Sequence, residues 1–200
     1  METKVEFSAF FRRIAGYSMT SWINFIIGIA SVVLMTRLFA PDVIGAYTLF
    51  NTATDLLMIF CCMGFDNALI RFFYAPPHDE SHQALFKRCV GASLLCYFIV
   101  VLVILMGFSH TLSALLFKTD DILLIVFLLL NVFSLLLMSR YLLLLFRMKN
   151  QIASYTVLQL LINFFSKIFV LASALLSSTI ESVLLFNTVG MVVLLLVYLV

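Results

Sequence analysis

The sequence predicts an all-α fold: a polytopic membrane bundle of six transmembrane helices. Hydrophobic residues make up 64% of the 200 residues and charged residues only 11%, whereas soluble domains carry about 25% charge. A chain this apolar cannot hide its apolar surface in one water-excluding core, so lipid must cover it. Its apolar runs are too long, and too uniformly apolar, for the alternating strands of a membrane barrel.

Six apolar runs define the predicted spans. At about 1.5 Å per residue, a helix needs roughly 20 residues to cross about 30 Å of hydrocarbon. The first run is retained as a span because it exceeds the roughly 7–15 apolar residues of a signal peptide. The spans cover about residues 16–35, 46–65, 89–108, 122–146, 152–176 and 183–200.

Short connections place the six spans in one bundle that covers residues 1–200. Pro41 marks the first turn and Pro76-Pro77 the second, since a helix cannot run through two prolines. Residues 5–14 space apolar side chains at helical intervals and predict an interfacial helix before the first span. The sequence stops within an apolar run, which predicts that the chain is the amino-terminal part of a longer protein.

Basic residues predict that the N-terminus is cytoplasmic, because Lys and Arg of short loops stay on the cytoplasmic side. Arg37 and Lys118 fall on the other side, and Lys167 falls within a span. The nine basic residues assigned to the cytoplasmic side are Lys4, Arg12, Arg13, Arg71, Lys87, Arg88, Arg140, Arg147 and Lys149.

Enzyme motifs are absent from the sequence. It contains no H-E-x-x-H, no Walker loop and no glycine-rich dinucleotide turn. The four cysteines have no C-x-x-C spacing and are predicted to be free thiols. His78 and His82 lie beside acidic residues, which is typical of a solvated loop rather than a metal site. We therefore expect no enzyme activity, no cofactor, no metal and no nucleic-acid partner.

Asp55 is the acidic residue nearest the middle of a predicted span. A carboxylate within the membrane faces a bundle interior or a water-filled path, where it can carry a proton or another cation. Asp55 is thus a candidate for ion coupling. The alternative is a structural hydrogen bond to a neighbouring helix, with Thr20 or Asn24 as the partner.

Gln159, Asn163 and Lys167 follow one another at intervals of four residues in the fifth span. This spacing lines them along one face of a helix, with Tyr155 at its inner end. Such a stripe suits a hydrophilic cavity in which the Lys167 ammonium neutralises a lipid-linked phosphate. Alternatively, Lys167 pairs with Asp55 or snorkels to the surface.

Three arginines lie at or near the ends of spans. The guanidinium fork binds phosphate in a bidentate manner, so Arg37 and Arg71 are candidate substrate-binding residues. Their structural alternatives are an ion pair between Arg37 and Asp42, and a membrane anchor at Arg71. Arg140, in the fourth span, is interpreted as a snorkelling anchor.

Two segments resemble a known family. Residues 36–47 read TRLFAPDVIGAY, which is similar to the first outward loop of bacterial polysaccharide exporters, where Arg-Leu-x-(Gly/Ala)-Pro-acid precedes Gly-x-Tyr. Residues 64–72 read GFDNALIRF, which resembles the Gly-Leu-Asp-x-Ala-x-x-Arg-Tyr/Phe that closes their second helix. The chain thus resembles the amino-terminal lobe of the oligosaccharide flippases of the multidrug/oligosaccharidyl-lipid/polysaccharide exporter superfamily.

The resemblance implies translocation of undecaprenyl-pyrophosphate-linked oligosaccharide units across the bacterial inner membrane for surface polysaccharide such as O-antigen. It implies alternating access with a second lobe or a second copy of the chain, and proton or Na⁺ coupling. Expected partners are the lipid-linked oligosaccharide, membrane lipid, a polysaccharide polymerase and a chain-length regulator. The substrate-binding residues would be Lys167, Asn163, Gln159, Asn24, Arg71 and Arg37, with Asp55 as the coupling residue.

Two other functions compete with this expectation. One is a drug/cation antiporter of the same superfamily, for which Asp55 is the supporting residue. The other is a non-transporting membrane subunit of a polysaccharide assembly complex. Such a subunit needs no cavity, and its polar stripes would face lipid or a packed helix.

Overall fold

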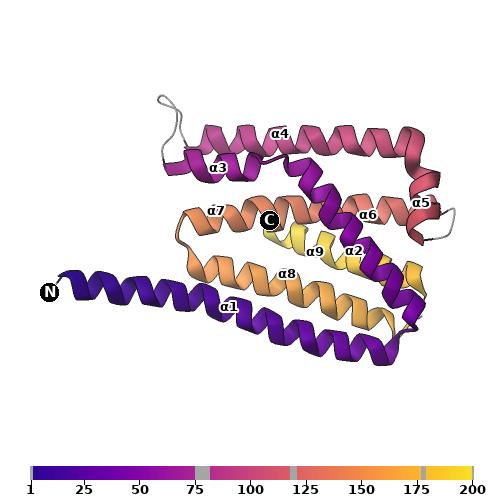
Figure 1. Ribbon diagram of the computed structural model, residues 1–200, viewed down its shortest axis with the longest axis horizontal. Helices are drawn as coiled ribbons and strands as arrows, with labels where there is room; N and C mark the ends of the chain where they lie inside the picture. Colours follow the sequence, from indigo (N-terminus) through magenta and orange to yellow (C-terminus); the bar gives the residue numbers. More distant parts are fainter. Residues whose placement is uncertain (1, 75–81, 118–120, 177–178, 200) are drawn as a thin grey trace.

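The computed structural model describes residues 2–74, 82–117, 121–176 and 179–199, which form helices and no strand (Figure 1). Two of the helical segments are π-helical and continue the α-helices beside them. The elements are α1 (Glu2–Leu38), α2 (Pro41–Cys62), α3 (Phe65–Tyr74), α4 (His82–Val103), η1 (Ile104–Phe108), α5 (Ser109–Phe117), α6 (Ile122–Leu135), η2 (Leu136–Leu142), α7 (Leu143–Met148), α8 (Ile152–Ser173) and α9 (Ile180–Leu199).

Within the described residues, six helices are long and apolar enough to cross a membrane, which confirms the predicted all-α, six-span bundle. Their outer surfaces carry large exposed hydrophobic side chains such as Trp22, Phe98 and Met106, as lipid-facing helices require. The candidate spans are Ser18–Leu38, Pro41–Cys62, His82–Phe117, Ile122–Met148, Ile152–Ser173 and Ile180–Tyr198.

Two helices extend well beyond the predicted spans. The first helix is continuous from Glu2, so the predicted interfacial segment and the first span form one helix. The third span continues through the π-helical turn Ile104–Phe108 to Phe117, beyond its predicted end at residue 108. The predicted turn at Pro76-Pro77 and the basic residue Lys118 lie outside the described residues.

The fourth span, Ile122–Met148, forms the centre of the bundle. It is the most buried of the candidate spans, and α6 packs against both α2 and α9. Leu124, Ile125 and Leu128 are fully buried where α6 meets these helices. The central helix therefore holds two sides of the bundle together.

The second span is interrupted between α2 and α3. Met63 and Gly64 have positive φ angles of 42° and 85°, which ends α2 and redirects the chain into α3. A left-handed residue after a helix is a common C-terminal cap, and glycine reaches this region without steric strain. Figure 1 shows α3 lying beside the first half of α4, at an angle to α2. The sequence-based span through residue 65 therefore misses a helix break.

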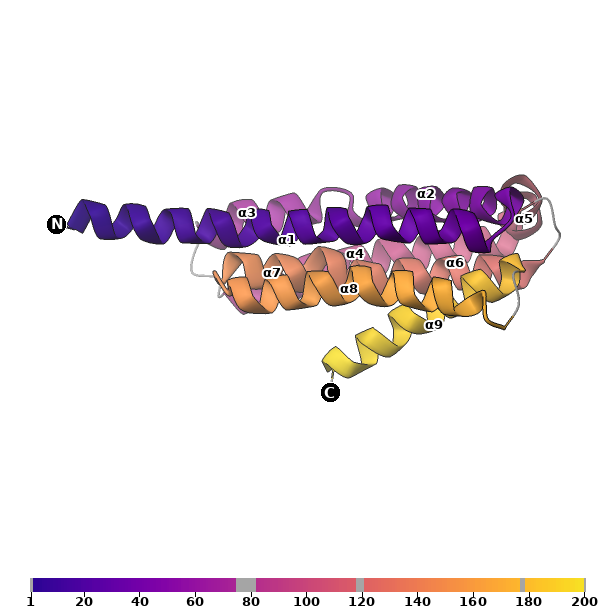
Figure 2. The same ribbon diagram turned by 90° about the horizontal axis from the view of Figure 1, so that it is seen from below.

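The helices α1 and α8 run parallel and side by side. Thr20 on α1 and Thr156 on α8 share a hydrogen bond of 3.0 Å, and the other face of α8 packs against α9. Gly190 allows this second contact, since a Cβ built there would lie 2.8 Å from Cγ of Phe169. Towards its C-terminal end, α9 diverges from the other helices (Figure 2).

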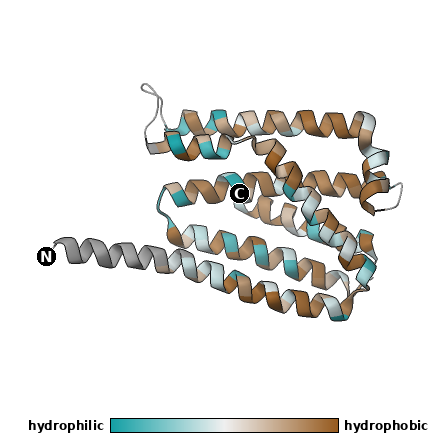
Figure 3. Cartoon of the chain, in the orientation of Figure 1, coloured by the Kyte–Doolittle hydropathy of each residue, from teal (hydrophilic) through white to brown (hydrophobic). Residues whose placement is uncertain are grey.

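Hydrophilic residues gather at one end of the bundle, where α3 ends, α4 and α8 begin and α7 ends (Figure 3). This end carries basic side chains from α3, α4 and α7, namely Arg71, Lys87 and Arg147, and Lys149 directly after α7. The N-terminus of α1 points the same way (Figure 1). The fold thus brings together basic residues that the sequence analysis assigned to one side of the membrane.

Candidate functional site: a polar cavity near the basic end

A polar cavity of about 480 Å³ opens between α2, α3, η2, α7 and α8. Two acidic and two basic side chains line it, Asp55, Asp66, Arg140 and Arg147, which is an unusual density of charge for a bundle of this composition. Charged groups within membrane spans are costly and mark substrate or ion paths. Its other lining residues are Met58, Asn67, Ile70, Leu135, Ser139, Leu143, Leu144, Tyr155 and Gln159.

The helix break after α2 positions the acidic side of the cavity. Asp66 is the second residue of α3, and its Oδ1 accepts a hydrogen bond of 2.9 Å from the backbone N–H of Asn67. A carboxylate in the first turn of a helix is also favoured by the helix dipole. The left-handed turn at Met63 and Gly64 thus directs Asp66 and Asn67 to the cavity.

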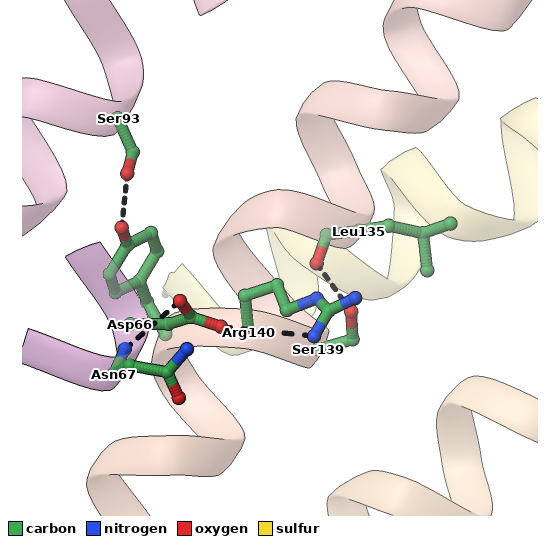
Figure 4. A network of polar contacts seen from close by, with 7 residues as sticks. Asp66, Asn67, Ser93, Leu135, Ser139 and Arg140 are labelled. Atoms are coloured by element: carbon green, nitrogen blue, oxygen red, sulfur yellow. Dashed lines mark hydrogen bonds and ion pairs between the residues drawn. The ribbon is translucent and has the colours of Figure 1, made fainter. Parts of the chain in front are cut away.

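The π-helical segment η2 positions the basic side. It places the adjacent residues Ser139 and Arg140 at the cavity, while Tyr141 is buried on another side. The hydroxyls of Tyr141 and Ser93 share a hydrogen bond, and the Tyr141 hydroxyl donates to the Cys89 carbonyl at 3.3 Å. These contacts join η2 to α4, and Figure 4 shows the one to Ser93. Insertions of this kind in helices are frequent at functional sites.

Arg140 and Asp66 form an ion pair across the cavity. Their closest atoms, Nη1 and Oδ2, are 3.8 Å apart, and Figure 4 shows the guanidinium and the carboxylate from close by. The Arg140 side chain is 41% exposed and that of Asp66 is 19% exposed. A long pair with this exposure contributes little stability, on the order of 0–1 kcal/mol. Arg140 is therefore available to an incoming anion, and its interpretation as a snorkelling anchor misses this contact.

Asp55 and Gln159 are the two sequence-predicted site residues that line the cavity. Asp55 is exposed, and the described part of the chain gives it no ion pair or hydrogen-bond partner. Thr20, one of its two predicted partners, instead bonds to Thr156 and to the Gly16 carbonyl. The Oε1 of Gln159 is buried and lacks a hydrogen-bond partner among the described residues, so it is a candidate acceptor for a ligand.

The other predicted site residues lie outside the lining of this cavity. The Asn163 amide donates to the backbone carbonyl of Gln159 at 3.0 Å, and the Lys167 ammonium lies 5.7 Å from the ring centroid of Tyr47. Lys167 thus makes a cation–π contact with α2 rather than an ion pair with Asp55. The predicted stripe on α8 does face α2, but only Gln159, with Tyr155 one turn before it, lines the cavity.

Asn24, Arg37 and Arg71 are also outside the cavity. The Oδ1 of Asn24 is buried without a hydrogen-bond partner in the described structure, one turn beyond the Thr20 contact with α8. Arg37 is exposed in the last turn of α1, and its predicted ion pair with Asp42 is not found among the described residues. Arg71 is exposed, and its guanidinium lies over the adjacent Phe72 ring at 5.6 Å.

The cavity also has four lining residues that were not predicted from the sequence, namely Asp66, Asn67, Ser139 and Arg147. Asp66 and Asn67 belong to the segment GFDNALIRF, in which only Arg71 was assigned a binding role. Arg140 and Arg147 are seven residues apart, a helical spacing that places two cations two turns apart on one face. In the described ranges of the chain, no group of three or more His, Cys, Asp or Glu side chains could hold a metal ion.

No protein-family model matches the sequence, and comparisons with curated proteins and with solved structures found no match. The polar cavity and its charged lining residues are therefore the features of this chain that point to a function.

Proposed function

We propose that this chain is a lobe of a transporter that moves a lipid-linked oligosaccharide diphosphate across a bacterial inner membrane, with its N-terminus in the cytoplasm. One observation carries the proposal: a charged cavity opens between the helices of a bundle whose outer surface is largely apolar. Its volume of about 480 Å³ is within the roughly 300–1,000 Å³ of small-molecule sites. A polar head group can enter such a cavity while its lipid tail stays in the bilayer.

The two arginines of the cavity suit a diphosphate. Arg140 and Arg147 lie two turns apart on the continuous η2–α7 helix, and both line the cavity. The planar guanidinium donates paired hydrogen bonds to phosphate oxygens. Two such groups on one face of a helix can engage two linked phosphates from the same side.

The neutral polar lining suits a sugar. Asn67, Ser139, Tyr155 and Gln159 offer amide and hydroxyl groups to the same cavity. These groups both donate and accept hydrogen bonds, as sugar hydroxyls do. The arginines and the neutral groups together provide for both parts of an oligosaccharide diphosphate head group.

The ion pair between Arg140 and Asp66 provides a way to exchange partners. A phosphate that approaches Arg140 competes with the Asp66 carboxylate, which is 3.8 Å from the guanidinium. Charge-assisted bonds to phosphate are shorter, at about 2.7–2.9 Å. We expect the ion pair between Asp66 and Arg140 to open when the substrate binds and to form again when the substrate leaves.

Asp55 is the proposed coupling residue. It lines the cavity, yet the described residues offer its carboxylate no basic partner. A proton or Na⁺ bound there would change the net charge of the cavity, and with it the affinity for an anionic head group. The same carboxylate favours a second candidate, a drug/cation antiporter, in which a cationic drug would occupy the place of the ion.

The presence of the cavity weighs against the third candidate, a non-transporting subunit. That function requires helices packed without a hydrated space, and the polar side chains of α2, α3, η2 and α8 would then face lipid or a packed helix. Here they face a common cavity instead.

Binding of undecaprenyl diphosphate to the purified chain in neutral detergent tests the proposal. Arg140→Gln and Arg147→Gln each remove a charged hydrogen-bond donor, so we expect each to weaken binding by roughly tenfold to a hundredfold. Arg37→Gln is the matched control, because Arg37 is exposed at the other end of the bundle. Undecaprenol, which lacks the diphosphate, should bind weakly to every variant.

Two results would contradict the proposal. The first is unchanged diphosphate binding by both cavity arginine variants. The second is tight binding of ethidium that Asp55→Asn abolishes, which would assign the cavity to a cationic drug. In cells, the arginine variants should lose surface polymer while their amount in the membrane stays equal to that of Arg37→Gln.

A further inference from the structure

A second cavity, of about 630 Å³, lies at the basic end of the bundle between α3, α4 and α7. It shares no lining residue with the polar cavity. Its lining residues are Phe73, His82, Gln83, Phe86, Lys87, Leu145 and Lys149. We call it the basic-end pocket.

The basic-end pocket lies where two membrane spans end. The candidate span His82–Phe117 begins at it, and the candidate span Ile122–Met148 ends one residue before its Lys149. Helix ends of this kind lie at the boundary between hydrocarbon and water, where lipid head groups lie. The pocket is therefore at head-group level rather than in the middle of the membrane.

The lining combines an apolar wall with exposed cations. The rings of Phe73 and His82 lie 4.8 Å apart between centroids with their planes tilted by 32°, and the Phe86 and Tyr141 rings meet edge to face at 6.2 Å. Lys87 and Lys149 are both exposed at the pocket. None of the seven lining residues among those that the structure describes is acidic. By contrast, the Arg140 of the polar cavity has Asp66 as its counter-ion.

We propose that the basic-end pocket binds an anionic phospholipid of the surrounding leaflet. Its phosphate would lie between Lys87 and Lys149, and the first part of an acyl chain would lie against Phe73, Phe86 and Leu145. Basic pockets between transmembrane helices on the cytoplasmic side are typical sites for anionic lipid head groups. The proposal does not depend on what the polar cavity transports.

The apolar wall distinguishes a lipid from a soluble phosphate. A free anion would need hydrogen-bond donors on several sides, whereas Phe86 and Leu145 offer none. A lipid fills both parts of the pocket at once. Its phosphate meets the lysines and its glycerol and acyl carbons cover the apolar side chains.

Lipid binding to the purified chain in neutral detergent tests the proposal, with dioleoyl phosphatidylglycerol as the probe and native mass spectrometry as the readout. We expect Lys87→Gln and Lys149→Gln each to weaken binding about fivefold, and the double variant to weaken it by roughly twenty-fivefold. Arg71→Gln is the matched control. It removes one exposed cation at the same end that does not line the pocket.

Two further arms separate the sources of binding. Dioleoyl phosphatidylcholine has the same acyl chains without net negative charge, and glycerol 3-phosphate has the phosphate without the chains. We expect both to bind at least about fivefold more weakly than phosphatidylglycerol. Melting temperatures without added lipid should be equal among the variants, which shows that each is folded.

Three outcomes would overturn the lipid site. Equal binding of phosphatidylcholine would mean that the charge plays no part. Competition by glycerol 3-phosphate at the same concentration would identify a soluble phosphate ligand instead. An equal loss in Arg71→Gln and Lys149→Gln would mean that the lipid responds to the charge of the whole end rather than to this pocket.

Discussion

The contact between α8 and α9 depends on Gly190, which has a hydrogen atom in place of a side chain. A Cβ at Gly190 would lie 2.8 Å from Cγ, 3.0 Å from Cδ2 and 3.1 Å from Cβ of Phe169. Ordinary carbon–carbon contacts are about 3.5–4.0 Å, so the shortest of these falls short by about 0.7 Å. Because Phe169 Cβ is attached to the backbone, the ring alone cannot relieve the overlap. Gly190→Ala should therefore push α8 and α9 apart.

Gly28 provides a matched comparison. It also lies inside a membrane span, and a Cβ built there meets nothing within 4 Å. Both substitutions replace glycine with alanine, a better helix former, which stabilises each variant by up to about 1 kcal/mol. This contribution cancels when the two variants are compared. Overpacking costs about 1–3 kcal/mol, and the rigid geometry at Phe169 places Gly190→Ala in the upper half of that range. We expect the two variants to differ by about 2–3 kcal/mol.

Thermal unfolding of both variants in the same detergent measures this difference. For a chain of this size it corresponds to a melting temperature roughly 4–12 °C lower for Gly190→Ala than for Gly28→Ala. Phe169→Ala removes Cγ and Cδ2, the atoms of the two shortest contacts. It should therefore lower the melting temperature less in the Gly190→Ala background than in the unaltered chain. The overlap is refuted as the cause if Gly190→Ala melts at or above Gly28→Ala, or if Phe169→Ala costs as much in both backgrounds.

Two other predictions concern the contacts that shape the polar cavity. Tyr141→Phe leaves the fully buried Ser93 hydroxyl without its partner and should lower the free energy of unfolding by about 1–3 kcal/mol. Adding Ser93→Ala should recover part of this loss. A double variant less stable than Tyr141→Phe would argue against the hydrogen bond between the two hydroxyls. Gly64→Ala places a side chain at φ 85°, which costs about 1–2 kcal/mol. It should also strengthen undecaprenyl diphosphate binding, because a displaced Asp66 no longer competes with phosphate for Arg140. Gly91→Ala, which has open space around the added Cβ and no positive φ, should neither lower the melting temperature nor change the binding.

The membrane class and the helix count can be predicted from composition and run length alone, because hydrocarbon excludes every alternative to a helix or a closed barrel. The grouping of basic residues at one end could also be predicted, since it needs only the alternation of antiparallel spans. Asp55 and Gln159 could be found because a polar side chain within an apolar run is conspicuous. These predictions use local information, namely which residues are apolar and how far apart they lie.

The ion pair between Asp66 and Arg140 needs information that a single sequence does not carry. The two residues come from different spans. The residues around each of them in the sequence do not indicate which helices are neighbours in the bundle. Lys167 illustrates the same gap: the sequence suggests Asp55 as its partner on α2, whereas the structure gives it Tyr47 on the same helix. Two turns separate these α2 residues, so the facing helix could be predicted but its register could not.

The position of Arg140 also depends on a change of helical phase. On α6 and at the start of η2, the buried residues Leu128, Val132 and Leu136 recur every fourth position. Continued as an α-helix, this pattern would place Arg140 in the apolar core next to Leu136. The π-helical turn Leu136–Leu142 adds a residue to the turn and rotates the later part of the helix, so that Tyr141 is buried and Arg140 lines the cavity. A charge that would be costly in the core thereby reaches a carboxylate and an open polar cavity, and the irregular helix makes that possible.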